Sequence, residues 1–277
     1  MRYFVKISRE MDKFRSKTVA VTPAILDLER IDRPVVGFAF DYALGDHIDR
    51  HQHSKAQLIY AIRGIMTVTT DAGTWVVPPN RAVWVPARTD HEIALSGAVS
   101  MRTLYVAAHA AARLPGTCCV VTVPDLLREL ILKVVGFGQP YPPQGREARL
   151  VEVVLDELET IPVAPLFVHM PQDPRVAEIV RTVRADVADA RSLEDWSAKV
   201  GASPRTLARI FVRETGLTFG RWRRQLRLLA ALERLGSGES VTSVALALGY
   251  DSPSAFISIF KKHMGATPAQ YFSAKSD

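Results

Sequence analysis

The sequence predicts a two-domain α+β protein, in which a strand-rich N-terminal domain precedes an all-helical C-terminal domain. Short apolar runs, rich in β-branched and aromatic residues, recur between residues 33 and 108, whereas the pattern after residue 174 is helical. Four prolines between residues 160 and 174 prevent a continuous helix and favour an extended connector. We therefore expect one domain over residues 1–160, a linker over 161–174 and a second domain over 175–277.

The strand-rich part is expected to form a sandwich or small barrel over about residues 33–110. Its apolar runs are separated by glycine and proline, and they fall at residues 57–62, 65–70, 75–77, 82–85 and 101–106. Two helices are expected between about residues 124 and 160, because apolar residues recur there at helical spacing. This pair either packs on its own domain or forms a dimer interface, and the sequence leaves both open.

The composition, with 48% hydrophobic and 23% charged residues, is typical of a globular protein. No apolar run approaches the roughly 20 residues that span a bilayer, so no membrane partner is expected. The charged N-terminal stretch lacks the apolar core of a secretory signal. The only cysteines, Cys118 and Cys119, are adjacent and are expected to be reduced thiols, which favours a cytoplasmic protein.

The helical half contains an internal repeat. Residues 203–211 (SPRTLARIF) correspond to residues 252–260 (SPSAFISIF) at an offset of 49, and Gly216 corresponds to Gly265 at the same offset. Each copy opens with Ser-Pro, an N-cap serine followed by a proline at the first helical position. In each copy, a helix is therefore expected to begin at this serine, Ser203 or Ser252.

A short helix precedes each Ser-Pro, over residues 193–200 in the first copy and 241–248 in the second, and a glycine, Gly201 or Gly249, follows it. A short helix, a glycine turn and a capped second helix make a helix-turn-helix. One such pattern is a weak signal, but two copies at a fixed offset are a strong one. A helical stretch over residues 219–235 is expected to join them, and a helical repeat that binds protein is the alternative.

Basic residues are concentrated around the first copy. Nine arginines and lysines lie between Lys199 and Arg234, against the two acids Glu214 and Glu233, within a chain of net charge +6. Such a block suits a polyanion such as double-stranded DNA, although charge alone is equally consistent with a solvated surface.

These residues resemble the AraC/XylS family of bacterial transcription regulators over about residues 175–272. The resemblance rests on residues 203–211 and on the stretches ETG (214–216), ALGY (247–250) and GATPAQYF (265–272). It implies two helix-turn-helix subdomains that enter adjacent major grooves of DNA. It assigns the reading positions to Arg205, Thr206, Ala208 and Arg209 in the first recognition helix, and to Pro253, Ser254, Ile257 and Ser258 in the second.

Arg209 is the first candidate for base reading, because arginine can contact guanine O6 and N7 together, and Arg205 is the next. A phosphate contact is the alternative for each. The second helix lacks a long polar side chain on its reading face, so we expect it to position the protein, with Lys261 and Lys262 as phosphate contacts. Reading of methyl groups through Ile257 is the alternative.

A second constellation lies in the strand-rich half. Gly45, His51, His53, Gln57 and Gly64 follow the spacing G-x5-H-x-H-x3-Q-x6-G, and Pro86 and His91 follow P-x4-H. This spacing is similar to the cupin pattern and implies a cupin-like β-barrel with two helices. The sequence departs from that pattern with Gln57 for glutamate, Arg88 for glycine and Leu95 for asparagine.

The cupin resemblance implies that His51, His53, Gln57 and His91 converge on one divalent metal, such as Zn²⁺, Ni²⁺ or Fe²⁺. A metal-free polar ligand pocket is the main alternative, and purely structural histidines are the third interpretation. Together the two halves favour a transcription regulator, and not an enzyme, controlled by a small-molecule or metal effector. Its expected partners are operator DNA, RNA polymerase and a second copy of the chain. The competing hypotheses are a metal-dependent cupin enzyme with a DNA-binding tail, and an architectural protein without sequence preference.

Overall fold

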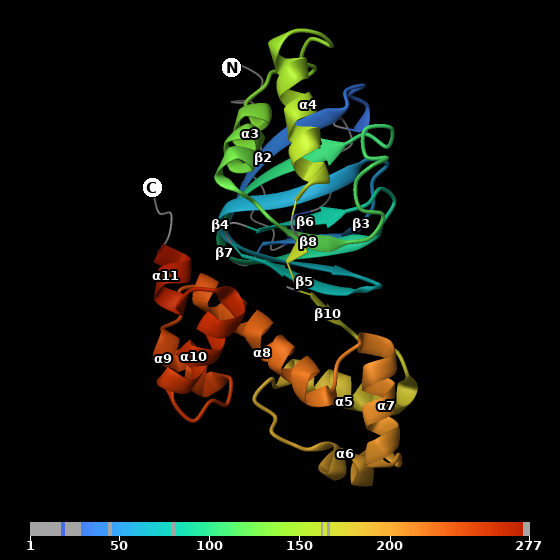
Figure 1. The fold of residues 1–277 in the computed structure, drawn as a ribbon, viewed down its shortest axis with the longest axis vertical. Helices are drawn as coiled ribbons and strands as arrows, with labels where there is room; N and C mark the ends of the chain where they lie inside the picture. The colour runs from blue at the N-terminus through green and yellow to red at the C-terminus, as the bar shows by residue number, and fades with distance from the viewer. Residues whose placement is uncertain are drawn as a thin grey trace. The chain divides into compact units, whose positions relative to one another are not determined.

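A computed structural model describes residues 18–19, 29–43, 46–78, 81–161, 163–164 and 167–273. The chain forms two compact units (Figure 1), one comprising Met1–Asp71 and Val77–Pro165 and the other Ala72–Val76 and Leu166–Asp277. The first unit is rich in strands and the second in helices, which confirms the predicted fold class.

The sheet of the first unit has the strand order β1-β3-β7-β4-β6-β8-β9, and β2 also pairs with β7. All of these pairings are antiparallel except that of β1 with β3. The strands are β1 (Thr18–Val19), β2 (Val35–Tyr42), β3 (His47–His51), β4 (Ala56–Thr70), β6 (Arg81–Val85), β7 (His91–Val106), β8 (Cys119–Thr122) and β9 (Val163–Ala164).

Strands β4 and β7 form the longest ladder of the sheet. Strand β4 contains both of the apolar runs, at residues 57–62 and 65–70, that the sequence pattern separates. The register of the β4–β7 ladder shifts between Ala61 and Arg63 and again between Arg63 and Ile65. Gly64 lies between these shifts with φ +82°, and a Cβ there would come within 2.6 Å of the carbonyl oxygen of Ala98. Such irregularities bend a strand, so β4 and β7 can change direction without breaking their ladder.

The two faces of this sheet carry different side chains, because alternate residues of a strand point to opposite faces. Leu58 pairs with Leu104 and lies in the core beneath the helices, whereas the neighbouring pair of Gln57 and Tyr105 faces the other way. Helices α3 (Asp125–Val135) and α4 (Arg146–Glu159) pack against each other beside the sheet (Figure 1). Both helices fall where apolar periodicity predicts them, and each presents a buried apolar stripe to the core.

The proline-rich stretch predicted as a connector contains two short strands. Strand β9 pairs with β8 within the first unit, and β10 (Phe167–His169) pairs with β5 (Gly73–Val77). In that second pair, the rings of Phe167 and Trp75 stack with centroids 4.4 Å apart. Proline prevents helix but leaves the intervening residues able to join a ladder, which explains strands within this stretch.

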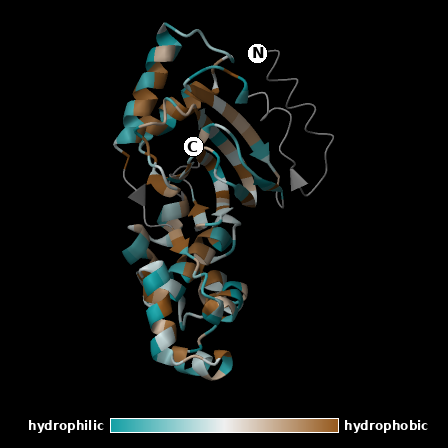
Figure 2. Cartoon of the chain, turned by 90° about the vertical axis from the view of Figure 1, so that its right-hand side faces the viewer, coloured by the Kyte–Doolittle hydropathy of each residue, from teal (hydrophilic) through white to brown (hydrophobic). Residues whose placement is uncertain are grey.

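The second unit is helical, with amphipathic helices that turn apolar sides inward (Figure 2). Its helices are α5 (Pro174–Ala185), α6 (Leu193–Val200), α7 (Pro204–Thr215), α8 (Phe219–Gly236), α9 (Val241–Ala247), α10 (Pro253–Met264) and α11 (Pro268–Ser273). Helix α8 joins two groups, with α5–α7 at one end and α9–α11 at the other (Figure 1). Within the described ranges, no helix combines the length and apolar character needed to cross a bilayer.

Candidate DNA interface and histidine cluster

Helices α6 and α7 form the first predicted helix-turn-helix. Ser192 accepts a hydrogen bond from the Asp195 amide, and Asp195 accepts one from the Ser192 amide, so a capping box opens α6. Gly201 ends α6 in the left-handed conformation, with φ +68°. Ser203 then caps α7 through the Thr206 amide, as the Ser-Pro signal predicts. These local signals therefore produce the expected short helix, turn and second helix.

Helices α9 and α10 repeat this arrangement. Ser240 caps α9 and Ser252 caps α10, in each case through the amide three residues later. Gly249 has φ +74° in the turn between the two helices. Gly265 ends α10 in the left-handed conformation, as Gly216 ends α7, so the 49-residue repeat is also a repeat of capping geometry.

The predicted reading positions lie on the sides of α7 and α10 that are not buried. In α7, Leu207, Ile210 and Phe211 are buried, whereas Arg205 and Arg209 are exposed. Thr206 and Ala208 are half-buried, and the Thr206 hydroxyl lies 3.0 Å from that of Ser203. In α10, Ser254, Ser258, Lys261 and Lys262 are exposed, Pro253 and Ile257 are half-buried, and Phe256 and Phe260 form the core.

The basic block divides into two groups that the sequence does not distinguish. Five of its members are engaged within the unit, and one of them, Arg234, pairs with Glu239. Lys199 pairs with Glu178 and Arg213 pairs with Asp173 and Glu214, whereas Arg223 and Arg227 donate to backbone carbonyls. In the described part of the chain, four exposed members form no ion pair, and they are Arg205, Arg209, Arg221 and Arg224. Arg221 and Arg224, at the start of α8, are thus added to the predicted interface. Arg223 and Arg227 are removed from it, because their guanidinium groups bind backbone carbonyls within the unit.

The three predicted histidine ligands come together in the first unit. His51 ends β3, His91 begins β7, and His53 follows two residues after His51. One ring nitrogen from each of the three lies within 4.8 Å of the others. His53 is 5% exposed and His91 is fully buried, whereas His51 is half-buried. Gly45 of the motif lies outside the described residues.

The other ring nitrogens are engaged by the backbone. The Nδ1 atoms of His51, His53 and His91 contact the carbonyl oxygens of Asp49, Lys55 and Thr89. A carbonyl can only accept, so each Nδ1 carries the hydrogen and each neutral ring keeps its lone pair on Nε2. The Nε2 atom of His91 is buried without a hydrogen-bond partner among the described residues.

Gln57 lies against the cluster and is itself held in place. Its Oε1 is 2.9 Å from His53 Nε2, and its Nε2 donates to the Thr103 hydroxyl at 2.9 Å. That hydroxyl donates in turn to the carbonyl of Leu58, which orients the amide oxygen of Gln57 towards His53. With the hydrogen of His53 on Nδ1, its Nε2 lone pair faces the Gln57 oxygen, so two acceptor atoms are turned towards each other.

The surroundings of the cluster favour uncharged rings. Burial lowers the pKa of His91 to about 3 and also lowers the pKa of His51. The turn before His91 is strained, because Arg88 adopts φ +59° where the cupin pattern has glycine. The Arg88 amide donates to the carbonyl of His53 at 2.9 Å, so this turn connects the two segments that carry the cluster.

Comparison with known proteins finds a family match for each half of the chain. Residues 34–132 match the model of the AraC-like ligand binding domain, and residues 196–274 match that of a helix-turn-helix domain. The chain is 37% identical over 223 residues to the HTH-type transcriptional regulator NimR of Escherichia coli (strain K12), covering 80% of this chain and 81% of NimR. The chain belongs to the AraC family of transcriptional regulators.

This AraC-family regulator is also 26% identical over 148 residues to the arabinose operon regulatory protein of Salmonella typhimurium, covering 52% of each chain. A solved structure of ToxT from Vibrio cholerae aligns with it at a TM-score of 0.38 and 12% identity, covering 88% of this chain and all of that one. The matched ligand-binding segment contains the three histidines, and the matched helix-turn-helix segment contains both recognition helices.

Proposed function

We propose that this AraC-family regulator recognises specific DNA sites by placing α7 and α10 in successive major grooves, under the control of a ligand held at the histidine cluster. The observation that carries the DNA part is the pair of capped helix-turn-helix units joined by α8. At about 1.5 Å per residue, α8 spans about 27 Å, which approaches the roughly 34 Å of one DNA turn.

The two recognition helices have different roles in this proposal. Arg209 and Arg205 are exposed on α7 and free of ion pairs within the described residues, so both can reach a base edge or a phosphate. Helix α10 presents the short hydroxyls of Ser254 and Ser258, with Lys261 and Lys262 one turn further. Base reading is therefore assigned mainly to α7, and backbone contacts mainly to α10.

Selection of DNA sites from a random library by the purified full chain, at physiological salt, tests this proposal. The expected result is a motif of two parts, separated by about one helical turn. Equal binding to all sequences would contradict it and favour an architectural protein. We expect action in the cytoplasm, on promoters that RNA polymerase also occupies.

For the ligand, we propose a divalent transition metal held by His51, His53 and His91. The residues fit such an ion because three Nε2 lone pairs converge, and backbone carbonyls hold the opposite nitrogens, as outer-shell partners do in metal sites. Zn²⁺, Ni²⁺ and Fe²⁺ all accept imidazole, and the Gln57 oxygen offers a fourth contact. The ion would act as the effector or anchor a small-molecule effector with a donor atom.

A regulatory role for this site is favoured over a catalytic one. In the described part of the chain, the cluster consists of three histidines without a carboxylate. Oxygen-activating iron sites commonly use two histidines and one carboxylate. We therefore propose no enzymatic activity, and oxygen consumption by the iron-loaded protein would contradict this.

We also propose that the chain forms a homodimer through α3 and α4. Each helix exposes a large apolar side chain, Leu126 on α3 and Val153 on α4, with 55% and 41% of the residue surface accessible. A second copy of the same helix pair would cover both, since a twofold interface uses the same patch on each subunit.

A further inference from the structure

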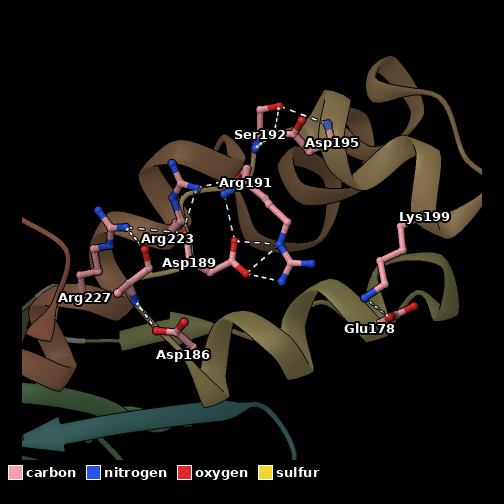
Figure 3. Close-up of polar contacts among 10 residues, drawn as sticks. Glu178, Asp186, Asp189, Arg191, Ser192, Asp195, Lys199, Arg223 and Arg227 are labelled. Atoms are coloured by element: carbon pink, nitrogen blue, oxygen red, sulfur yellow. Dashed lines mark hydrogen bonds and ion pairs between the residues drawn. The ribbon is translucent and has the colours of Figure 1, made fainter.

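The loop between α5 and α6, residues 186–191, is stiffened by its own side chains (Figure 3). Asp186 accepts a hydrogen bond from the Ala188 amide, and Asp189 accepts one from the Arg191 amide. The Asp189 carboxylate also pairs with the Arg191 guanidinium, and only 7% of the Asp189 side chain is exposed. The Arg191 guanidinium stacks 3.8 Å from the centroid of the buried Trp196 ring, which fastens the loop to α6.

Two arginines of α8 bind the backbone of this loop (Figure 3). Arg223 donates to the carbonyls of Asp189 and Arg191 at 3.2 and 2.8 Å. Arg227, one helical turn further on, donates to the carbonyls of residues 187, 188 and 189 at 2.7, 3.1 and 3.4 Å. Both guanidinium groups thus face the loop backbone. The several N–H donors of an arginine can bind carbonyls at different positions, and a lysine ammonium is less suited to this.

The same loop also contacts the turn of the second helix-turn-helix. Gly249 lies against Ala188 so closely that a Cβ at this glycine would come within 3.3 Å of Ala188 Cα, Cβ and O. The Arg227 guanidinium lies 6.0 Å from the centroid of the adjacent Tyr250 ring. Loop 186–191 therefore touches the first subdomain, the joining helix and the second subdomain at once.

We propose that loop 186–191 is a spacer that fixes the distance and angle between α7 and α10, and that Arg227 and Gly249 are its positioning residues. The inference rests on the proposed recognition of a two-part DNA site. Each helix-turn-helix has its own buried core, around Leu207 and Phe211 in one and Phe256 and Phe260 in the other. The contacts that Arg227 and Gly249 make with the loop lie outside both cores, so their effect is on how the two subdomains are held relative to each other.

Binding to DNA of altered spacing tests this role. The selected two-part site is compared with versions that carry one or two base pairs more or fewer between its halves, and with each half alone. For the unaltered protein we expect the affinity to fall by at least about 10-fold when the spacing changes. For Arg227→Ala we expect weaker binding at the native spacing, binding within about 3-fold across all spacings, and an unchanged affinity for the isolated α7 half-site.

Further variants separate positioning from charge and from folding. Arg227→Lys keeps the charge but loses the fork of donors, so it is expected to lie between Arg227→Ala and the unaltered protein in spacing preference. Arg213→Ala is the matched control, because it removes an arginine from an exposed ion pair elsewhere in the unit. Gly249→Ala places a methyl group 3.3 Å from Ala188 at a residue with φ +74°, and should weaken binding at the native spacing.

A full spacing preference in Arg227→Ala overturns the inference and leaves the proposed function intact. Full spacing preference in Arg227→Lys together with a loss in Arg213→Ala also overturns it, since charge alone then decides. If the unaltered protein selects no DNA motif, the proposed function fails, and this inference fails with it.

Discussion

The rings of His51 and His91 lie 4.3 Å apart, centroid to centroid, and each directs its Nδ1 atom to the backbone carbonyl two residues earlier. Two strands distant in sequence thus present paired Nε2 lone pairs on the face of the sheet opposite α3 and α4. Because backbone carbonyls hold both ring orientations, the two Nε2 atoms are fixed relative to each other. Such preorganisation reduces the cost of binding a ligand.

The first prediction concerns stability in the presence of zinc. At a zinc concentration of about 100 times the dissociation constant, binding to the folded state alone adds about 2.7 kcal/mol to the free energy of unfolding. Thermal unfolding with zinc and with a chelator measures this difference. His51→Ala should abolish it, and His109→Ala, at an exposed histidine outside the cluster, should keep it. Equal stabilisation of all three proteins would mean that the cluster does not bind the ion.

The second prediction concerns Gln57. Gln57→Glu places a carboxylate beside His53 Nε2, where the amide oxygen now lies 2.9 Å away, and should tighten metal binding by about 10-fold or more. Competition with a chelator of known affinity measures the change. Gln57→Leu removes the oxygen and should weaken binding, so an unchanged affinity in both variants would exclude Gln57 from the site.

The third prediction separates base reading from phosphate contact on DNA. Arg209→Ala should cost about 1–3 kcal/mol on the selected site and relax the base preference at one position. Arg221→Ala should weaken binding to all sequences alike and lower the slope of affinity against salt by about one. Titration of specific and random DNA at several salt concentrations gives both quantities. A uniform loss for Arg209→Ala would make it a phosphate contact.

The fourth prediction concerns the acid stability of the helical unit. The hydrogen bond from Arg191 holds the pKa of Asp189 below its ordinary value. Since the folded-state pKa is the lower one, the pair stabilises the unit above about pH 4 and loses this effect as the pH falls further. Asp189→Asn should cost about 1–3 kcal/mol at pH 7 and flatten the acid limb of the stability profile. Denaturant unfolding at a series of pH values measures it, and a parallel profile for the variant would be inconsistent with this role.

The fifth prediction concerns assembly. Leu126→Asp and Val153→Asp should shift the chain from dimer to monomer, because a charge replaces an apolar side chain that a second copy would cover. Leu246→Asp is the matched control, since Leu246 is 60% exposed but lies on α9 in the helical unit. Light scattering after size exclusion gives the mass of each variant. A dimer that survives both α3 and α4 variants would place the interface elsewhere.

The sequence by itself determined the local features of this protein. Ser-Pro caps, glycine turns and apolar periodicity specify where α6, α7, α9 and α10 begin and end, because these signals act between residues a few positions apart. The same holds for α3, α4 and α8.

Only the tertiary structure decided which of the polar side chains are available to a ligand. Arg209 and Arg227 both belong to the basic block, and nothing in the sequence distinguishes them. In the structure, Arg209 is exposed on α7, whereas Arg227 donates to the carbonyls of residues 187–189, some 40 positions away. Likewise, the amide of Gln57 is oriented by Thr103 on a neighbouring strand. Hydrogen bonds of this kind form between segments that only the folded chain brings together, so no local pattern encodes them.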